Sequence, residues 1–269
     1  MLRLLSVALF LPGGAWAASP DDLSRLHEIL RTDTLMEILS DEGLQESESL
    51  RDDMFPGRGG VGWTAVTGQI YDVSRMQGLF RDAFNAELAD AEIAPLLAFY
   101  TGDVGARVAA LEVEARRAIS SEDVEAAARI AYEAIQGSGS EREALLDRFA
   151  EENGLVDRNV ASALNANLAF FRGLGSGQGF EMTEDQILRD VWEQEPEIRD
   201  DTVGWVYGFM TFAYETLSDD QLQAYVELSA TDAGKDLNRA FFAGFDALFL
   251  DVSFAIGAAT AQFSVGDEL

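Results

Sequence analysis

The chain contains no cysteine, a single histidine (His27) and a single lysine (Lys235) among its 269 residues. Without cysteine there are no disulfides, so core packing must hold the fold together, which a chain of this length can achieve. With no cysteine and one histidine we expect no structural zinc site, and a serine–histidine–aspartate nucleophile would depend wholly on His27 in a chain without a G-x-S-x-G motif. The zinc-protease pattern would need a second histidine where Arg31 stands, so we expect His27 to be a partly exposed helix residue.

Basic residues are also scarce: 19 Lys and Arg stand against 48 Asp and Glu, which gives a formal net charge of −29. Nucleic acids and anionic membrane surfaces bind through cationic contacts, so this charge excludes both as partners. The run 57–62 (GRGGVG) matches G-x-G-x-x-G, but no strand precedes it and no βαβ unit can be drawn around it. We therefore expect no cofactor and no metal site.

Strand-like alternation is nearly absent, whereas apolar residues recur at three- and four-residue spacing along most of the chain. This periodicity predicts an all-α, multi-helix bundle. The expected helices span 21–31, 34–53, 63–87, 90–100, 103–119, 121–136, 140–153, 157–174, 183–195 and 197–217. Capping boxes are expected at Ser140, Thr183 and Ser218, and glycine-rich connectors at 137–139 and 173–179.

The first residues have the organisation of a secretory signal peptide. Arg3 precedes an apolar run from Leu4 to Leu11, and Ala15-Trp16-Ala17 forms a small-x-small cleavage site. The run is too short for a permanent membrane anchor. Residues 1–17 are therefore expected to be removed on export, which predicts a periplasmic protein.

Two segments of the remaining chain are similar: 88–111 and 217–240, at a constant spacing of 129 residues. They share Leu88/Leu217, Asp90/Asp219, Asp103/Asp232 and Gly105/Gly234. Matched apolar residues around a shared glycine predict one helix–turn–helix packing arrangement used twice. We expect two related helical halves, 18–138 and 139–269, with the second copy of the segment degenerate.

The first copy carries an apolar pair followed by Phe99-Tyr100, the hydroxyl residue Thr101, then Gly105 and the basic residue Arg107. This pattern resembles the signature of a bacterial family of exported helical proteins, catalogued as domain-of-unknown-function family 2059. The second copy keeps Gly234 and Lys235 but has Leu-Ser in place of Phe-Tyr. The resemblance covers about 20 residues closely, implies an exported all-α module and assigns no activity.

The signature residues also have a structural interpretation. Phe99 and Tyr100 end one helix with large apolar side chains, and Thr101 is expected to cap the next. Gly105 removes a side chain where the preceding helix passes closely, which would offset the roughly 1 kcal/mol that glycine costs a helix interior.

The apolar terminal stretch 241–263 contains Asp246 and Asp251, whose carboxylates would each cost about 2.5–3.5 kcal/mol inside a bilayer. We expect this stretch to be a helix packed against the second half, with no stable membrane insertion, and with Arg239 neutralising Asp246. These two acids are the candidates for a carboxylate enzyme, although no catalytic motif is present.

Three functions remain open. The first is a non-catalytic interaction or scaffold module of the cell envelope with a protein partner. The second is a carrier of a small apolar or lipid-like ligand, suggested by the aromatic-rich faces at Phe80, Phe84, Phe99, Phe209, Phe212, Phe241 and Phe245. The third, a carboxylate-based enzyme, has the weakest support.

Overall fold

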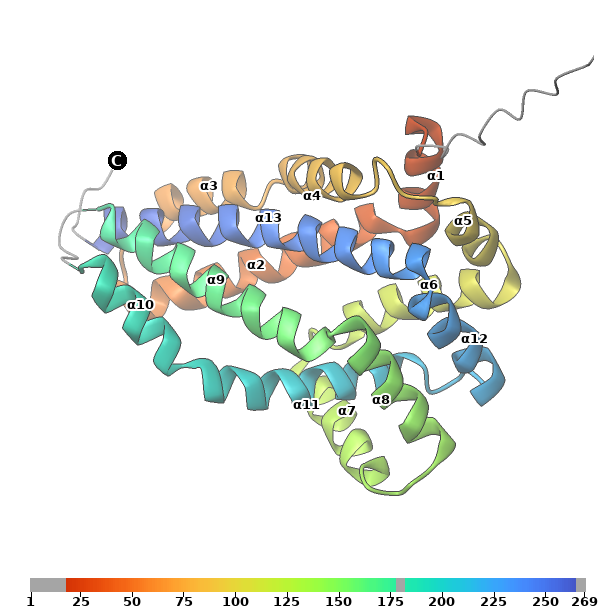
Figure 1. The fold of residues 1–269 in the computed structure, drawn as a ribbon. Coiled ribbons are helices and arrows are strands. Elements are labelled where there is room, and N and C mark those ends of the chain that lie inside the picture. The colour runs from red at the N-terminus through yellow and green to blue at the C-terminus, as the bar shows by residue number, and fades with distance from the viewer. Residues whose placement is uncertain (1–17, 178–181, 265–269) are drawn as a thin grey trace, which may run out of the picture.

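The computed structural model describes residues 18–177 and 182–264, and the regular secondary structure of these residues is entirely α-helical (Figure 1). The expected signal peptide lies outside the described residues. The helices of the first part are α1 (Pro20–Leu30), α2 (Thr32–Met54), α3 (Gly60–Ile70), α4 (Val73–Glu87), α5 (Ala94–Tyr100), α6 (Asp103–Ala118) and α7 (Glu122–Ile135). Those of the second part are α8 (Glu141–Asn153), α9 (Leu155–Gly175), α10 (Glu184–Glu193), α11 (Glu195–Ala213), α12 (Asp219–Ala230) and α13 (Asp232–Ser264).

The all-α prediction is therefore confirmed, and so are two of the three capping boxes. The hydroxyl oxygens of Thr183 and Ser218 each accept a hydrogen bond from the backbone N–H three residues on. In return, the backbone N–H of each capping residue donates to the side-chain oxygen of the glutamine at that position. Ser140 caps α8, but the Glu143 carboxylate turns to the backbone N–H groups of Gly137 and Gly139 instead. Glu143 thereby fixes the conformation of the loop that connects α7 and α8.

The single long helix expected over 63–87 is wrong, because the chain breaks between α3 and α4. Asp72 begins α4 by accepting a hydrogen bond from Arg75 N at 2.9 Å. The Tyr71 carbonyl leaves the helix ladder and accepts from Ser40 Oγ of α2 at 2.6 Å. A side-chain cap and a remote donor thus satisfy the backbone groups that the break exposes.

Two other helix ends differ from the expectation. Helix α5 begins at Ala94, since Pro95 is tolerated only in a first turn. Helix α11 ends at Ala213. In the turn that follows, the carbonyls of Tyr214 (3.1 Å) and Leu217 (2.6 Å) accept hydrogen bonds from the Arg142 guanidinium.

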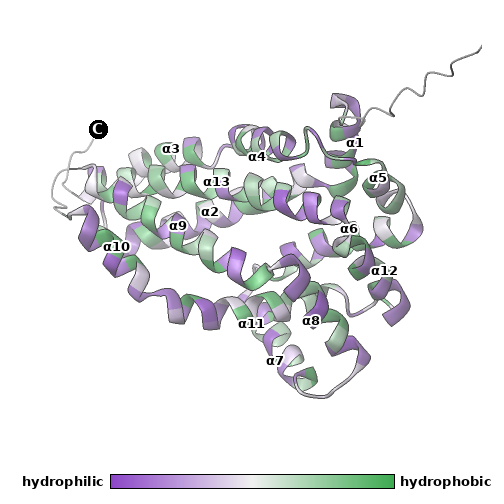
Figure 2. Cartoon of the chain, viewed as in Figure 1, coloured by the Kyte–Doolittle hydropathy of each residue, from purple (hydrophilic) through white to green (hydrophobic). Residues whose placement is uncertain are grey.

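Helix α13 lies at the centre of the molecule, between α4 and α9 (Figure 1). The terminal helix packs against the second half as expected, on α9, and it also contacts α4 of the first half. The buried core runs continuously through both halves. Figure 2 shows hydrophobic residues along much of α3 and the neighbouring part of α13, and hydrophilic residues on outer turns of α8, α10 and α12. One shared core therefore joins the two predicted halves.

Helices α9 and α13 run in the same direction, and their backbones approach closely at Gly173 and Gly257. Ser162 of α9 donates to Asp246, and further along Phe170 faces Gly257. A Cβ atom on Gly257 would lie 2.1 Å from the Phe170 carbonyl oxygen, and one on Gly173 would lie 2.1 Å from a carbonyl oxygen of α13. The two glycines allow the backbones to touch.

The expected Arg239–Asp246 pair is wrong. Arg239 binds Glu87 of α4 at 3.0 Å and Asp236 on its own helix, while Asp246 accepts from Ser162. Asp251 pairs with Arg75 of α4. Among the described residues, α13 is the one helix whose length and composition would suffice to cross a membrane. Both of its central carboxylates are held by neighbouring helices.

Candidate functional site

The first-copy signature connects the two predicted halves. Tyr100 is 2% exposed, and the Phe99 ring stacks on Tyr225 of α12 with centroids 6.0 Å apart and planes at 17°. Arg107 crosses to the same region and donates to the Thr216 carbonyl at 2.7 Å. Thr101 does not cap α6 as expected: Gly102 is the capping residue, and Thr101 Oγ1 donates back to the Leu97 carbonyl.

Both signature glycines lie where two helices meet backbone to backbone. A Cβ atom on Gly105 would lie 2.3 Å from the Phe99 carbonyl oxygen, and one on Gly234 would lie 2.1 Å from that of Leu228. The helices they belong to begin at equivalent positions, Asp103 and Asp232. The close approach expected at Gly105 is therefore present in both helix pairs. The neighbouring signature residue Lys235 is exposed. Duplication itself stays a prediction, because similar local geometry does not establish common origin.

A carboxylate surrounded by tyrosines lies beneath this signature. Glu112 of α6 accepts hydrogen bonds at one oxygen, Oε1, from Tyr214 Oη (2.6 Å) and Tyr225 Oη (2.9 Å). Burial raises the pKa of Glu112 above its usual range, and the two tyrosine bonds oppose that shift. Burial likewise raises the pKa of Tyr100, and the nearby Glu112 charge raises it further by a smaller amount. We refer to Tyr100, Glu112, Tyr214 and Tyr225 as the Glu112 cluster.

Glu112 is not among the residues predicted from the sequence, although a signal for it is present. Glu112 follows Val108 by four residues and precedes the buried Ala115 by three, so it stands in the apolar stripe of α6. Its tyrosine partners are at most 8% exposed. The cluster therefore links α6 to the end of α11 and to α12.

His27 is buried, not partly exposed as expected. Its side chain is 1% exposed, with Nδ1 3.0 Å from Thr32 Oγ1 and Nε2 2.9 Å from Asn85 Oδ1. Its ring lies 4.7 Å from that of Phe84. Two polar partners from other helices make this burial tolerable, and Asn85, 58 residues away, could not be inferred from the local pattern around His27.

Burial lowers the pKa of His27 below 6.5, partly offset by its bond to Asn85. A depressed pKa in the folded state means that stability present above pH 6.5 is lost as the pH falls and the folded imidazole is forced to protonate. We expect NMR titration of this one imidazole to give a midpoint below 6.5. The accompanying loss of unfolding free energy should be absent from a His27→Gln variant, and a midpoint at or above 6.5 would contradict the assignment.

The residues proposed for carboxylate chemistry are not brought together. Asp246 and Asp251 engage Ser162 and Arg75, respectively, on different neighbours of α13. Within 18–177 and 182–264, no three His, Asp or Glu side chains gather in a way that could hold a metal ion. Six of the seven aromatic residues expected to hold a ligand pack ring against ring instead; Phe80, for example, lies 5.0 Å from Phe245. The seventh, Phe212, lines a groove between α7 and α11.

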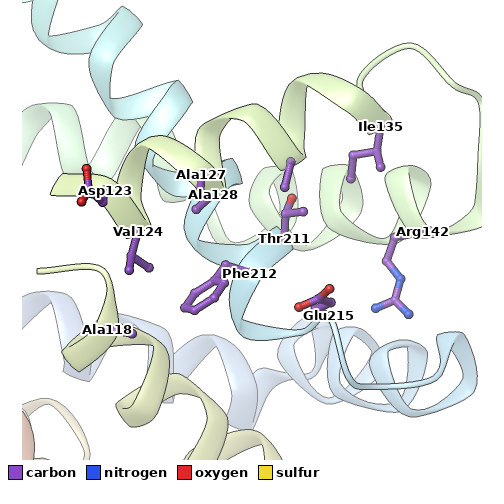
Figure 3. Close-up of a pocket in the computed structure, with 11 residues that line it drawn as sticks. Ala118, Asp123, Val124, Ala127, Ala128, Ile135, Arg142, Thr211, Phe212 and Glu215 are labelled. Atoms are coloured by element: carbon purple, nitrogen blue, oxygen red, sulfur yellow. The ribbon is translucent and has the colours of Figure 1, made fainter. Parts of the chain in front are cut away.

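An open groove of about 600 Å³ lies elsewhere, between α7 and α11 (Figure 3). Val124, Ala127, Ala131 and Ile135 of α7, at helical spacing, form one wall. Helix α7 packs on α11 along the adjoining line of its surface, where a Cβ atom on Gly208 would lie 3.3 Å from Ala128. Helix α11 thus covers only part of the apolar face of α7.

The other side of the groove combines an aromatic floor with a few polar groups. Phe212 of α11 faces α7, and Ala118 lies at the end of α6 (Figure 3). Thr211 points from α11 toward α7, and its Oγ1 is buried without a hydrogen-bond partner. Asp123 lies at one end of the groove, and Glu215 and Arg142 lie toward the other (Figure 3).

None of the signature residues lines this groove, so the sequence resemblance and the groove are separate features. In the sequence, the groove is signalled by the apolar stripe on 121–136 and by Phe212, one of the aromatic residues named for the carrier hypothesis. Buried core helices give the same kind of signal. No family model, curated protein or solved structure matches the chain. The resemblance to the exported helical family remains a prediction.

Proposed function

We propose that this protein is a non-catalytic binding module of the cell envelope, exported to the periplasm, which binds a protein partner in the groove between α7 and α11. The leader-like pattern of residues 1–17 supports export. The acidic, all-α chain carries no catalytic motif, and its candidate acids Asp246 and Asp251 lie apart from the groove. The carrier and enzyme hypotheses are alternatives to this proposal.

The observation that carries the proposal is the uncovered half of α7. Ala127 and Ala131 are exposed on the groove wall, and Ile130 beside them is 65% exposed. Apolar surface left open along a groove is typical of a recognition site, because burying it on binding is favourable. On the side of α7 that contacts α11, Arg129 forms ion pairs with Glu125 of α7 and Asp201 of α11.

The volume also falls in the range of small-molecule sites, which is the observation that favours a carrier. Carriers usually enclose most of their ligand, whereas this groove is only partly enclosed. A helix or strand of another protein can lie in such a groove with its outer face in water. The open shape therefore favours a protein partner.

The test is site-specific photocrosslinking in cells, with the native leader in place. A photoreactive amino acid at Ala131 should give a discrete adduct with a protein, whereas the same group at Glu133, exposed on the opposite face of α7, should not. A second substitution, Ala127→Glu, should suppress the adduct because it places a charge in the apolar wall.

Native mass spectrometry of periplasmic protein separates the alternatives. A constant added mass of a few hundred daltons that Ala127→Glu abolishes would replace the partner with a carried ligand. Equal adducts at Ala131 and Glu133, or none at Ala131, would overturn the proposal. Circular dichroism of each variant verifies that the helical fold is retained.

A further inference from the structure

Some of the charged side chains that line the groove already have partners within the protein, and others do not. Arg142 is already occupied, by the carbonyls of Tyr214 and Leu217 and by Asp219 at 2.8 Å. Asp123 and Glu215, by contrast, are exposed at the groove and form no ion pair among the described residues. The charges left available to a ligand are therefore acidic, one toward each end (Figure 3).

The apolar wall between them has the length of a short helix. From Val124 to Ile135 the α7 axis rises about 17 Å at 1.5 Å per residue. An amphipathic helix of about three turns presents apolar side chains at i, i+4, i+7 and i+11 over the same length. Such a helix would lay its apolar face on the wall and leave its polar face in water.

On this basis we propose that the occupant of the groove is an amphipathic helix of a partner protein, with Lys or Arg at both ends of its apolar face. The inference rests on the proposed function and names the partner's chemistry. Cationic ends would meet Asp123 and Glu215, and apolar side chains would contact Ala127, Ala131 and Phe212. This is the helix-in-groove mode of recognition, with charge selecting the partner.

Other occupants fit the same observations less well. A fatty-acid anion would place its carboxylate near Asp123 or Glu215, which repel it. A second copy of this chain would bring together two molecules of net charge −29. A cationic helix is attracted by that same charge, and its approach is accelerated before contact.

Fluorescence anisotropy with labelled synthetic peptides tests the inference on the full mature chain. One peptide of about fourteen residues carries four leucines at the spacing above and lysines at both ends. The matched peptide replaces every lysine with glutamate. We expect the lysine peptide to bind at least about tenfold more tightly at low salt, and the difference to shrink in about 0.5 M salt as the charges are screened.

Substitutions in the groove and on the opposite face of α7 test where the lysine peptide binds. The double substitution Asp123→Asn/Glu215→Gln should weaken the lysine peptide by about two- to twentyfold, as expected for two exposed ion pairs. Ala131→Trp, which fills the groove, should abolish binding of the peptide. Glu133→Gln removes one carboxylate from the opposite face of α7 and should leave the affinity unchanged.

The outcomes separate this inference from the proposed function. Equal binding of the two peptides, or an equal loss with Glu133→Gln, would overturn the cationic assignment. If neither peptide binds while Ala131 still crosslinks to a protein in cells, the groove binds a partner of another kind and the helix assignment is wrong. If neither peptide binds and Ala131 gives no adduct, both proposals fail.

Discussion

Replacing Gly257 with alanine should lower the free energy of unfolding by about 1–3 kcal/mol, the usual cost of overpacking a tight interior. The new methyl group would lie 2.1 Å from the Phe170 carbonyl oxygen, and a backbone atom cannot rotate away as a side chain can. Helices α9 and α13 would have to separate, which weakens the most extensive helix–helix contact of the fold. Denaturant unfolding followed by circular dichroism measures the change.

A matched control lies on α4. Gly78 is also inside a helix, but nothing lies within 4 Å of a Cβ atom placed there. Gly78→Ala should therefore raise the free energy of unfolding by about 0.5–1 kcal/mol through helix propensity alone. If Gly257→Ala were as stable as Gly78→Ala, the close crossing of α9 and α13 would be wrong.

Replacing Glu112 with alanine should cost about 2–4 kcal/mol of unfolding free energy. Tyr214 and Tyr225 would each lose the acceptor of a buried hydroxyl, and an unsatisfied buried donor costs about 1–3 kcal/mol. Glu112→Gln keeps an oxygen at that position and removes only the charge. Glu114→Ala, on the exposed side of the same helix, should change stability by less than about 0.5 kcal/mol.

The glutamine variant also has an expected pH dependence. Burial raises the pKa of Glu112, so the folded state holds that proton more tightly than the unfolded state does. The resulting stability is complete below the ordinary pKa of 4.5 and is lost as the pH rises through the folded-state value. Glu112→Gln should thus be at least as stable as the native chain at pH 8, and this relative advantage should vanish near pH 4. A larger advantage at pH 4 than at pH 8 would contradict the assignment.

Local patterns predicted the helices well, since an α-helix repeats its contacts every three to four residues. The capping boxes at Thr183 and Ser218 are short-range features of the same kind, and both are present. The break before α4 is different. It depends on Asp72, which the local sequence contains, and on Ser40, which binds the Tyr71 carbonyl from another helix.

Buried polar groups were predicted least well. His27 was expected near the surface because its partner Asn85 is 58 residues away in the chain. Glu112 was overlooked because its tyrosine partners lie more than 100 residues further on. For each group, remote donors or acceptors offset the cost of burial, and these partners could not be identified from the neighbouring sequence.

The amino-acid sequence by itself determined that this chain is helical, acidic and free of disulfides, because composition and periodicity act at short range. The tertiary structure alone decided that α13 joins both predicted halves and that α11 covers only part of the apolar face of α7. An apolar stripe such as Val124 to Ile135 has the same spacing whether it is buried in a core or left open along a groove. Which of the two occurs depends on how remote helices pack against it.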